Sequence, residues 1–261
     1  MNLQLRDKVI LITGGAKGIG AATARAFAAE QAIPVIMDRD ANAGKELCDE
    51  LRQAGARTSL IPADLTSADQ CKQSVAQCAT EFGKVDALIN NAGINDRVGL
   101  EQGNPEQYLS SLQRNLLHYY NMAHYALPHL KQSRGSIVNI SSKTAITGQG
   151  GTSGYASSKG AILALTREWA VELLPDGIRV NAIVPAEVMT PLYQQWLSTF
   201  PNPDEKLKNI VSKIPLGKRM TEPNEIAAMI VFLTSSKADH ITGQHIFVDA
   251  GYVHLDRALT Q

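Results

Sequence analysis

Short runs of β-branched and other apolar residues alternate with longer helical patterns along most of this chain. The first unit runs from Val9 to Thr13, through an alanine-rich helix expected at about 18–30, to a second strand at 34–38. Strands that alternate with helices predict βαβ units and a parallel sheet. The alternation continues with helices expected at about 42–55, 68–82, 105–131, 154–174 and 222–233, and strands at about 58–61, 87–90, 136–140, 178–184 and 245–249. The pattern therefore predicts an α/β fold with one continuous parallel sheet and helices on both faces.

The composition limits the kinds of partner to expect. The chain has 261 residues, of which 44% are hydrophobic and 19% charged, so we expect one compact domain over residues 1–261. Lys plus Arg equals Asp plus Glu at 25 each, which favours neither nucleic acid nor an anionic membrane surface. We therefore expect small-molecule ligands and copies of the same chain as partners.

Cysteine usage and the N-terminal segment bear on metal and location. Cys48, Cys71 and Cys78 are odd in number, with no C-x-x-C pair and no histidine cluster at zinc spacing, so we expect neither a metal nor a disulfide. The start carries Arg6 and Asp7 before a short apolar run, unlike a signal peptide, and no run reaches the length of a membrane span. The expected location is the cytoplasm.

A glycine loop lies between the first strand and the first helix. Such a loop lets the backbone approach a pyrophosphate, which then sits at the positive end of the helix. Alone this glycine spacing is a weak signal, because a structural turn looks similar. The loop reads Thr13-Gly14-Gly15-Ala16-Lys17-Gly18-Ile19-Gly20.

An acidic residue strengthens the dinucleotide interpretation. Asp38 closes the second strand 18 positions after Gly20, close to the interval at which a carboxylate meets the adenosine ribose hydroxyls. A carboxylate there repels a 2′-phosphate and favours NAD over NADP. Lys17 and Arg39 leave NADP open, because either could face that phosphate.

Four residues form a candidate catalytic group. Tyr155 and Lys159 lie one turn apart on a predicted helix. The ammonium group of the lysine would there lower the pKa of the tyrosine and make the tyrosine a better base. Ser142 follows the strand at 136–140 and could hydrogen-bond the reacting oxygen. Asn115, in the long preceding helix, could hold a water that links Lys159 to solvent. Each residue alone has an ordinary structural explanation, but together they predict proton and hydride transfer.

These motifs, in order, resemble those of the short-chain dehydrogenase/reductase family along nearly the whole chain. The resemblance rests on Thr13 to Gly20, Asp64, Asn90-Asn91-Ala92-Gly93, Asn115, Ser142 and Tyr155-Ala156-Ser157-Ser158-Lys159. It implies a doubly wound Rossmann fold with a seven-stranded sheet, usually in homotetramers, and Asn115, Ser142, Tyr155 and Lys159 as catalytic tetrad. It also implies cofactor contacts from Asp64, Leu65, Asn91, Ala92, Gly93, Pro185, Val188 and Thr190.

The chain departs from the family after the sixth expected strand. Where the family commonly has Pro-Gly, this chain has Pro185-Ala186 followed by Glu187, which makes the turn bulkier and adds a carboxylate. The contacts implied for Val188 and Thr190 are therefore less secure, and Glu187 is expected to face the substrate.

The expected substrate pocket is rich in polar side chains, which suits several hydroxyls held by hydrogen bonds better than an acyl chain. Further stretches resemble bacterial enzymes described as L-fucose dehydrogenases, which oxidise the anomeric hydroxyl of an aldose to a lactone. A 3-oxoacyl carrier-protein reductase or another polyol or hydroxy-acid enzyme is the alternative. A non-enzymatic NAD-binding regulator is disfavoured, because it needs no tetrad. The pocket residues are Asn95, Ser142, Lys143, Gln149, Tyr155, Glu187, Tyr193 and Trp196.

Two segments near the C-terminus break the alternation. Prolines divide residues 189–214 into amphipathic pieces, so we expect a substrate lid there that orders when cofactor and substrate bind. Residues 252–261 form a C-terminal tail.

Overall fold

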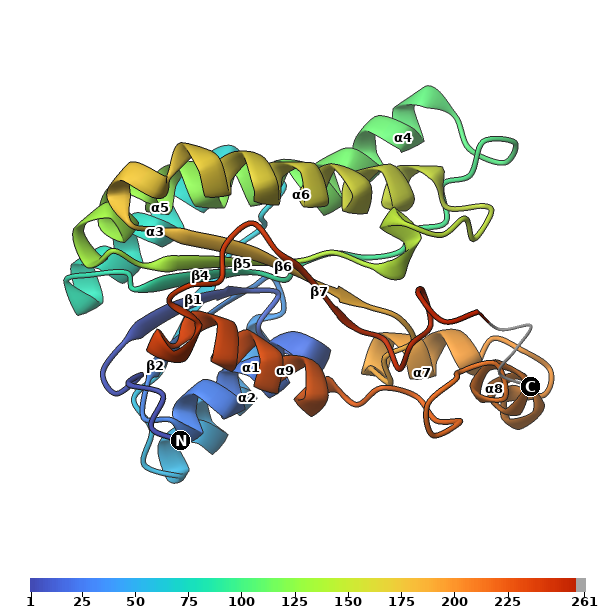
Figure 1. Cartoon of the computed structure of the whole chain (residues 1–261), viewed down its shortest axis with the longest axis horizontal. Helices are drawn as coiled ribbons and strands as arrows, with labels where there is room; N and C mark the ends of the chain where they lie inside the picture. Colours follow the sequence, from blue (N-terminus) through green and yellow to red (C-terminus); the bar gives the residue numbers. More distant parts are fainter. Residues whose placement is uncertain (257–261) are drawn as a thin grey trace.

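Seven parallel strands form one sheet in the order β3-β2-β1-β4-β5-β6-β7. The computed structural model describes residues 1–256 (Figure 1). Each strand is a short apolar run, as the sequence predicts, and the change of direction between β1 and β4 makes a switch point at the carboxyl edge. The strands are β1 Val9–Thr13, β2 Ile33–Asp38, β3 Ser59–Pro62, β4 Ala87–Asn90, β5 Ser136–Ile140, β6 Arg179–Pro185 and β7 His245–Val248. The predicted Rossmann-type fold is confirmed.

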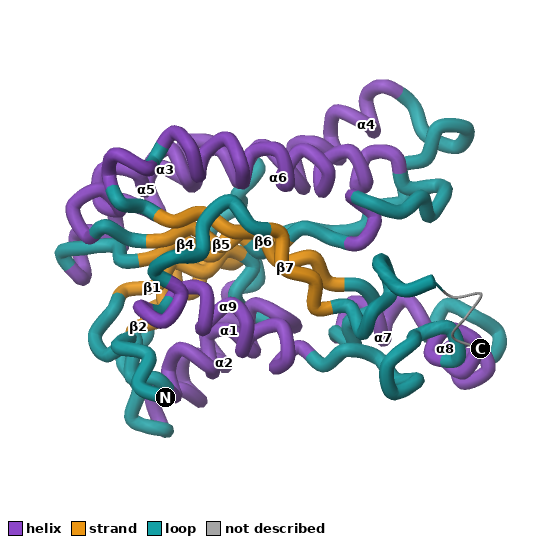
Figure 2. Tube along the Cα trace, in the orientation of Figure 1, coloured by secondary structure: helices purple, strands orange, loops and turns teal. Residues whose placement is uncertain are grey.

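Helices cover both faces of this sheet (Figure 2). Helices α3 (Ala68–Phe82), α5 (His118–Ser133) and α6 (Ser153–Glu172) pack on one face. Helices α1 (Gly18–Ala29), α2 (Ala41–Gln53) and α9 (Pro223–Thr234) pack on the other. Alternate residues of β1 divide between the two cores, with Val9 and Leu11 in one and Ile10 and Ile12 in the other. The three cysteines are buried and unpaired.

The long helix expected at 105–131 is not regular. The structure has α4 (Pro105–Leu112), a π-helical turn at Gln113–Leu117, and then α5. The Asn115 amide donates to the Ser111 carbonyl at 3.1 Å and so takes an acceptor that a regular helix would use. The expectation of one continuous helix was wrong at this turn, which also holds a predicted site residue.

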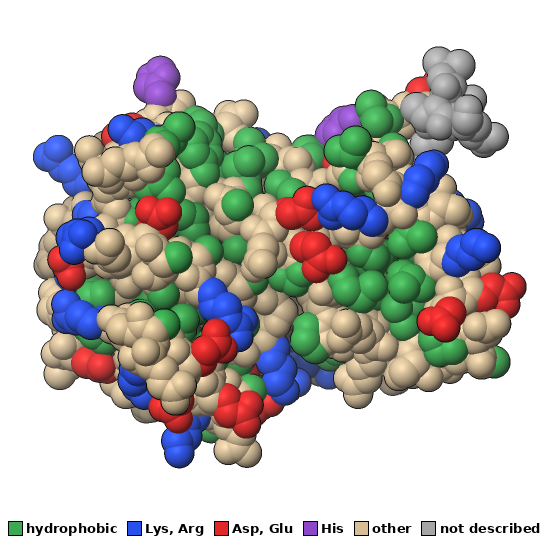
Figure 3. Space-filling view, turned by 90° about the horizontal axis from the view of Figure 1, so that it is seen from below, with side chains coloured by type: hydrophobic (Ala, Val, Ile, Leu, Met, Phe, Trp, Pro, Cys, Tyr) green, Lys and Arg blue, Asp and Glu red, His purple; other side chains and the backbone are tan. Residues whose placement is uncertain are grey.

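The segment at 189–214 contains two short helices, α7 (Pro191–Leu197) and α8 (Pro203–Val211), beyond the carboxyl edge of the sheet (Figure 1). Seen from below, apolar side chains gather between charged ones at this end of the molecule (Figure 3). Three short 3-10 turns complete the described elements: Lys143–Ala145, Leu174–Asp176 and Ser236–Ala238. No helix within residues 1–256 has the length and apolar character needed to cross a membrane.

Candidate active site

The glycine loop forms a cradle at the N-terminus of α1. Gly14 and Gly18 have φ of +60° and +54°, a region that favours glycine, and a Cβ on Gly20 would lie 2.1 Å from the Gly14 carbonyl oxygen. No side chain caps α1 and no acidic residue lies in its first turn. The amide N–H groups at this helix end are therefore open to an anion, which fits the pyrophosphate of a dinucleotide.

The loop after β4 is tied to this cradle. The Asn91 side-chain amide donates to the carbonyl oxygens of Thr13 and Gly14, both at 3.0 Å. The Thr13 hydroxyl accepts from the backbone N–H groups of Asn91 and Ala92. Gly93 lies next to the catalytic group, because a Cβ there would be 3.3 Å from Lys159 Nζ. The structure therefore brings the residues predicted after β1 and β4 together.

The acidic residue at the end of β2 faces the glycine loop. Asp38 Oδ2 accepts from the Ala16 amide at 3.0 Å, and its Oδ1 accepts from the Asp40 amide at 3.0 Å. Lys17, which left NADP open, pairs with Asp40 at 2.6 Å, while Arg39 is exposed. Asp38 thus lies against the glycine loop, and the Lys17 charge is compensated by Asp40.

The remaining predicted cofactor residues surround the same edge. Asp64 is exposed, and hydrogen bonds from Thr66 lower its pKa; Leu65 beside it is buried. Ile19 is half-buried in the first turn of α1, and Pro185 ends β6. Thr190 caps α7 and its methyl carbon would contact a Cβ on Gly18 at 3.3 Å. Val188 is buried, in a bridge with Thr221, which makes it a support for the loop.

Three of the four tetrad residues converge between β5 and α6. Ser142 is buried at the start of the turn after β5, and its hydrogen bond with Tyr155 lowers the tyrosine pKa. Burial has the larger, opposite effect and raises the pKa of Tyr155 to about 12. The expected lowering by Lys159 is not seen in this structure, because the Lys159 ammonium is directed elsewhere.

The Lys159 side chain is held by two groups that sequence reasoning missed. Its Nζ donates to the Ile140 carbonyl at 2.8 Å and to the Tyr119 hydroxyl at 3.0 Å, and lies 5.6 Å from the Tyr155 ring centroid. Burial lowers the pKa of Lys159 to about 7. Tyr119 is fully buried one helical turn after Asn115, and that spacing was the signal available in the sequence.

Asn115 acts in this structure through protein contacts. Its Oδ1 accepts from the Ile94 amide at 2.7 Å, and its amide donates to Ser111. Both contacts join the π-helical turn to the loop after β4. The side chain therefore holds that loop, and the expected role of binding water stays a prediction.

Three of the predicted substrate residues contact one another through hydrogen bonds or an ion pair, and two others are exposed. Lys143 Nζ pairs with Glu187 Oε1, and the Tyr193 hydroxyl donates to Glu187 Oε2 at 2.8 Å. The Lys143 and Glu187 side chains are only 9% and 15% exposed. Lys143 Nζ also lies 4.0 Å from the ring centroid of Tyr252, a residue that was not predicted. Asn95 and Gln149 are exposed, and no hydrogen bond or ion pair within residues 1–256 joins either of them to this group.

Helix α7 contacts the loop after β4. Trp196 of α7 lies edge-on to Tyr193 and to Phe200, with ring centroids 5.0 and 4.9 Å apart. The Arg97 guanidinium lies 5.8 Å from the Trp196 centroid. Residues from the loops after β4, β5 and β6 thus meet at the carboxyl edge, where open α/β sheets bind their ligands.

Comparisons with known proteins agree with this geometry. A family model described as enoyl-(acyl carrier protein) reductase matches residues 14–253. L-fucose dehydrogenase of Oryctolagus cuniculus is 38% identical over 245 residues, 94% of this chain and 84% of the relative. A 3-oxoacyl-[acyl-carrier-protein] reductase of Thermotoga maritima is 35% identical over 252 residues, covering 96% and 100%.

Solved structures agree in fold over the whole chain. The crystal structure of Cj0485 dehydrogenase has a TM-score of 0.96 at 48% identity and covers 100% of both chains. The ligand-free aldohexose dehydrogenase of Thermoplasma acidophilum has a TM-score of 0.89 at 31% identity, covering 98% of this chain and 97% of that one. Together with the sheet order, these matches show that this chain belongs to the short-chain dehydrogenase/reductase family and is an NAD(P)-dependent oxidoreductase that acts on CH–OH groups.

Proposed function

We propose that this enzyme oxidises the anomeric hydroxyl of L-fucose, or of a related aldose, to the lactone with NAD. The buried Lys143–Glu187 pair beside Ser142 carries the proposal. A carboxylate can accept from neighbouring hydroxyls while an ammonium donates to another, which suits a polyol. An acyl chain would displace water from this pair without offering either charge a hydrogen bond, at a cost in binding free energy.

The similar proteins support a sugar as the substrate, and they also leave one alternative function open. L-fucose dehydrogenases and an aldohexose dehydrogenase are among the similar proteins. The reductase of carrier-protein thioesters is similar to nearly the same degree. That alternative would require an apolar path for the acyl chain past Lys143 and Glu187.

In the proposed reaction Tyr155 takes the proton of the substrate hydroxyl, and Ser142 orients the oxygen that loses it. A bound nicotinamide supplies the hydride acceptor at its C4. Lys159 lies near Tyr155 and Gly93, where it would position the nicotinamide ribose. Asn115 keeps the loop after β4 in place through Ile94.

NAD is the proposed cofactor because Asp38 faces the adenosine end of the cradle. The pairing of Lys17 with Asp40 supports the same choice, since a compensated lysine attracts a 2′-phosphate less strongly. Residues 189–214 are proposed as the substrate lid of a single domain, in which α7 presents Tyr193 and Trp196 to the site. Residues 257–261 of the expected tail lie outside the described residues.

A homotetramer is proposed from the family and from exposed apolar side chains. Leu109 of α4, Tyr120 of α5 and Val171 of α6 are 64%, 55% and 68% exposed, on helices that cover the same face. Light scattering after size exclusion should give about four times the chain mass, and a monomer mass would refute this. The cytoplasmic location stays a prediction.

The test of the function is a comparison of initial rates with purified protein. One arm uses L-fucose, D-arabinose and other aldoses with NAD or NADP, and the second uses a short 3-oxoacyl thioester with NADPH. We expect NAD reduction with L-fucose or a stereochemical relative to give the larger kcat/KM. Faster oxidation of NADPH by the thioester would replace the sugar proposal with the reductase alternative.

A further inference from the structure

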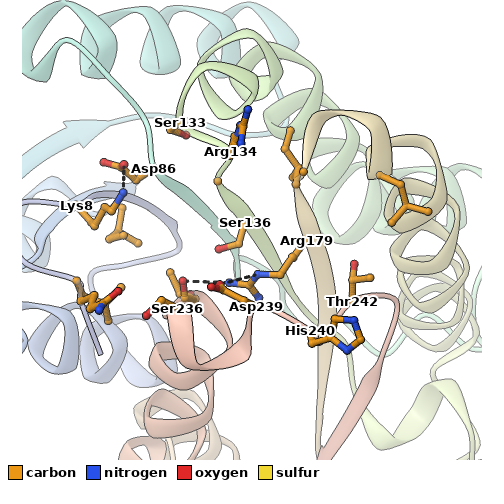
Figure 4. A pocket seen from close by; sticks show the side chains of 18 residues that line it. Lys8, Asp86, Ser133, Arg134, Ser136, Arg179, Ser236, Asp239, His240 and Thr242 are labelled. Atoms are coloured by element: carbon orange, nitrogen blue, oxygen red, sulfur yellow. Dashed lines mark hydrogen bonds and ion pairs between the residues drawn. The ribbon is translucent and has the colours of Figure 1, made fainter. Parts of the chain in front are cut away.

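A cavity of about 700 Å³ opens at the amino edge of the sheet, at the opposite ends of the strands from the candidate active site (Figure 4). Its lining includes Lys8 before β1, Asp86 before β4, Ser136 at the start of β5 and Arg179 at the start of β6. β5 alone separates the two sites by about 13 Å, at the usual rise per strand residue. The volume is that of an ordinary small-ligand pocket.

The first indication of a ligand is an unpartnered hydroxyl. Ser136 is 3% exposed, and its Oγ finds no hydrogen-bond partner among the described residues. In Figure 4 it lies amid the lining, with Arg134 on one side and Arg179 and Asp239 on the other. A buried hydroxyl without a partner costs free energy, so its place is best explained by a group that the protein itself does not supply.

Two arginines on the lining have N–H groups that make no hydrogen bond to the described residues. Arg134 is exposed and makes no ion pair or side-chain hydrogen bond within residues 1–256. Arg179 is 14% exposed and donates through both terminal nitrogens to the carbonyls of Leu233, Thr234 and Ser235. Its Nε lies 3.8 Å from Asp239 Oδ1, too far for a hydrogen bond, and burial lowers the pKa of Arg179.

Positive charge exceeds negative charge around the cavity. Asp86 is paired with two lysines, Lys8 at 2.9 Å and Lys84 at 3.0 Å. The Asp239 side chain faces Arg179 but is 73% exposed, so solvent screens much of its negative charge. The carbonyl end of α9 would oppose an anion, but Arg179 already satisfies those carbonyls. The net charge around the cavity is therefore positive.

We propose that this cavity binds a small oxyanion, the phosphate or carboxylate group of a small molecule, between Arg134, Ser136 Oγ and Arg179 Nε. Guanidinium groups match the oxygens of such anions, and the serine hydroxyl gains the partner it lacks. The site is separate from the dinucleotide cradle and does not depend on the proposed function.

Thermal unfolding with inorganic phosphate, at ionic strength held constant with sodium chloride, tests this directly. We expect a saturable rise in Tm for the wild type and at least tenfold weaker binding for Arg134→Gly and Ser136→Ala. Arg134 has φ +49°, so glycine suits its backbone and the variant should fold. Ser136→Ala should raise the Tm of the ligand-free protein, because it removes a buried unpartnered hydroxyl.

Phosphate could also bind at the uncapped end of α1, so Gly18→Ala is the matched control. Its Tm increment with phosphate should equal that of the wild type. Glucose 6-phosphate in place of phosphate identifies the source: tighter binding indicates a phosphorylated metabolite, and equal binding indicates the free ion. Absence of a saturable shift would overturn the proposal. So would a shift that survives both Arg134→Gly and Ser136→Ala, or one lost only in Gly18→Ala.

Discussion

Replacing Glu187 with glutamine separates its proposed role in substrate binding from its role in folding. Glutamine keeps the volume and can still accept from the Tyr193 hydroxyl, but it removes the charge that faces Lys143. A Lys143 side chain that is 9% exposed then keeps the ring of Tyr252, at 4.0 Å, as a favourable contact.

The stability cost follows from that burial. Removing one partner of a buried ion pair costs about 3–5 kcal/mol. The ring of Tyr252 offsets part of this, because a desolvated cation–π contact contributes about 2 kcal/mol, so we expect the lower end of the range. For a chain of this size each kcal/mol lowers Tm by about 2–4 °C, which gives a fall of about 6–12 °C in Glu187→Gln.

The activity cost is a separate quantity. A hydrogen bond from substrate to a charged group contributes about 1.5–3 kcal/mol, so kcat/KM for L-fucose should fall about 10- to 150-fold. The Kd for NAD should not change. Glu205→Gln is the control, since Glu205 is an exposed carboxylate on α8 of the same lid.

The double variant Lys143→Met, Glu187→Gln gives the decisive comparison. With both charges removed, much of the lost stability should return, because no uncompensated buried charge is left. The activity should stay low. If kcat/KM recovers together with Tm, the pair acts in folding only and the reasoning about hydroxyl recognition fails.

Four further outcomes follow from the site. Tyr155→Phe should lower kcat about 10²- to 10⁴-fold while NAD binding is kept. The kcat/KM of the wild type should rise through the alkaline range, because burial raises the pKa of Tyr155 to about 12. Retained turnover of the variant in a steady-state assay would exclude Tyr155 as the base. Burial lowers the pKa of Lys159 from 10.5 to about 7, so between these pH values the unfolded chain binds more protons than the folded one, and Tm should rise with pH. Lys159→Met should flatten this dependence of Tm on pH. Equal slopes of Tm against pH for wild type and variant in calorimetry would contradict this. Asp38→Asn should reduce the preference for NAD over NADP about tenfold in kcat/KM, and an unchanged ratio would remove Asp38 from cofactor selection. Tyr119→Phe removes one anchor of Lys159 and should lower kcat on the order of tenfold with an altered pH profile and little change in KM; a lower Tm with wild-type kinetics would make Tyr119 purely structural.

The strands and most helices could be predicted from the sequence because each is an apolar run with local start and stop signals. The edges differ by one or two residues, as at β2, which begins at Ile33, and α6, which begins at Ser153. The spacing of Tyr155 and Lys159 likewise fixed their common helix face. These features depend on neighbours within one or two turns.

The features that escaped prediction depend on residues far apart in the chain. The Lys143–Glu187 pair joins positions 44 apart, and the Lys159 ammonium finds a carbonyl 19 positions away. Neither pairing has a local pattern that favours it over solvent exposure. The π-helical turn at Gln113–Leu117 escaped for another reason: the Asn115 amide competes for a backbone carbonyl, and the apolar periodicity does not register that competition.

The central claim, that this chain takes a hydride from the anomeric carbon of an aldose, is tested most directly with L-fucose that carries deuterium at carbon 1. The reduced cofactor from a single incubation with NAD is isolated and its mass is measured. The account predicts a reduced cofactor one mass unit heavier than that formed from unlabelled L-fucose, and a lactone as the other product. A reduced cofactor without deuterium, or no reduction of NAD by any aldose tested, would contradict it.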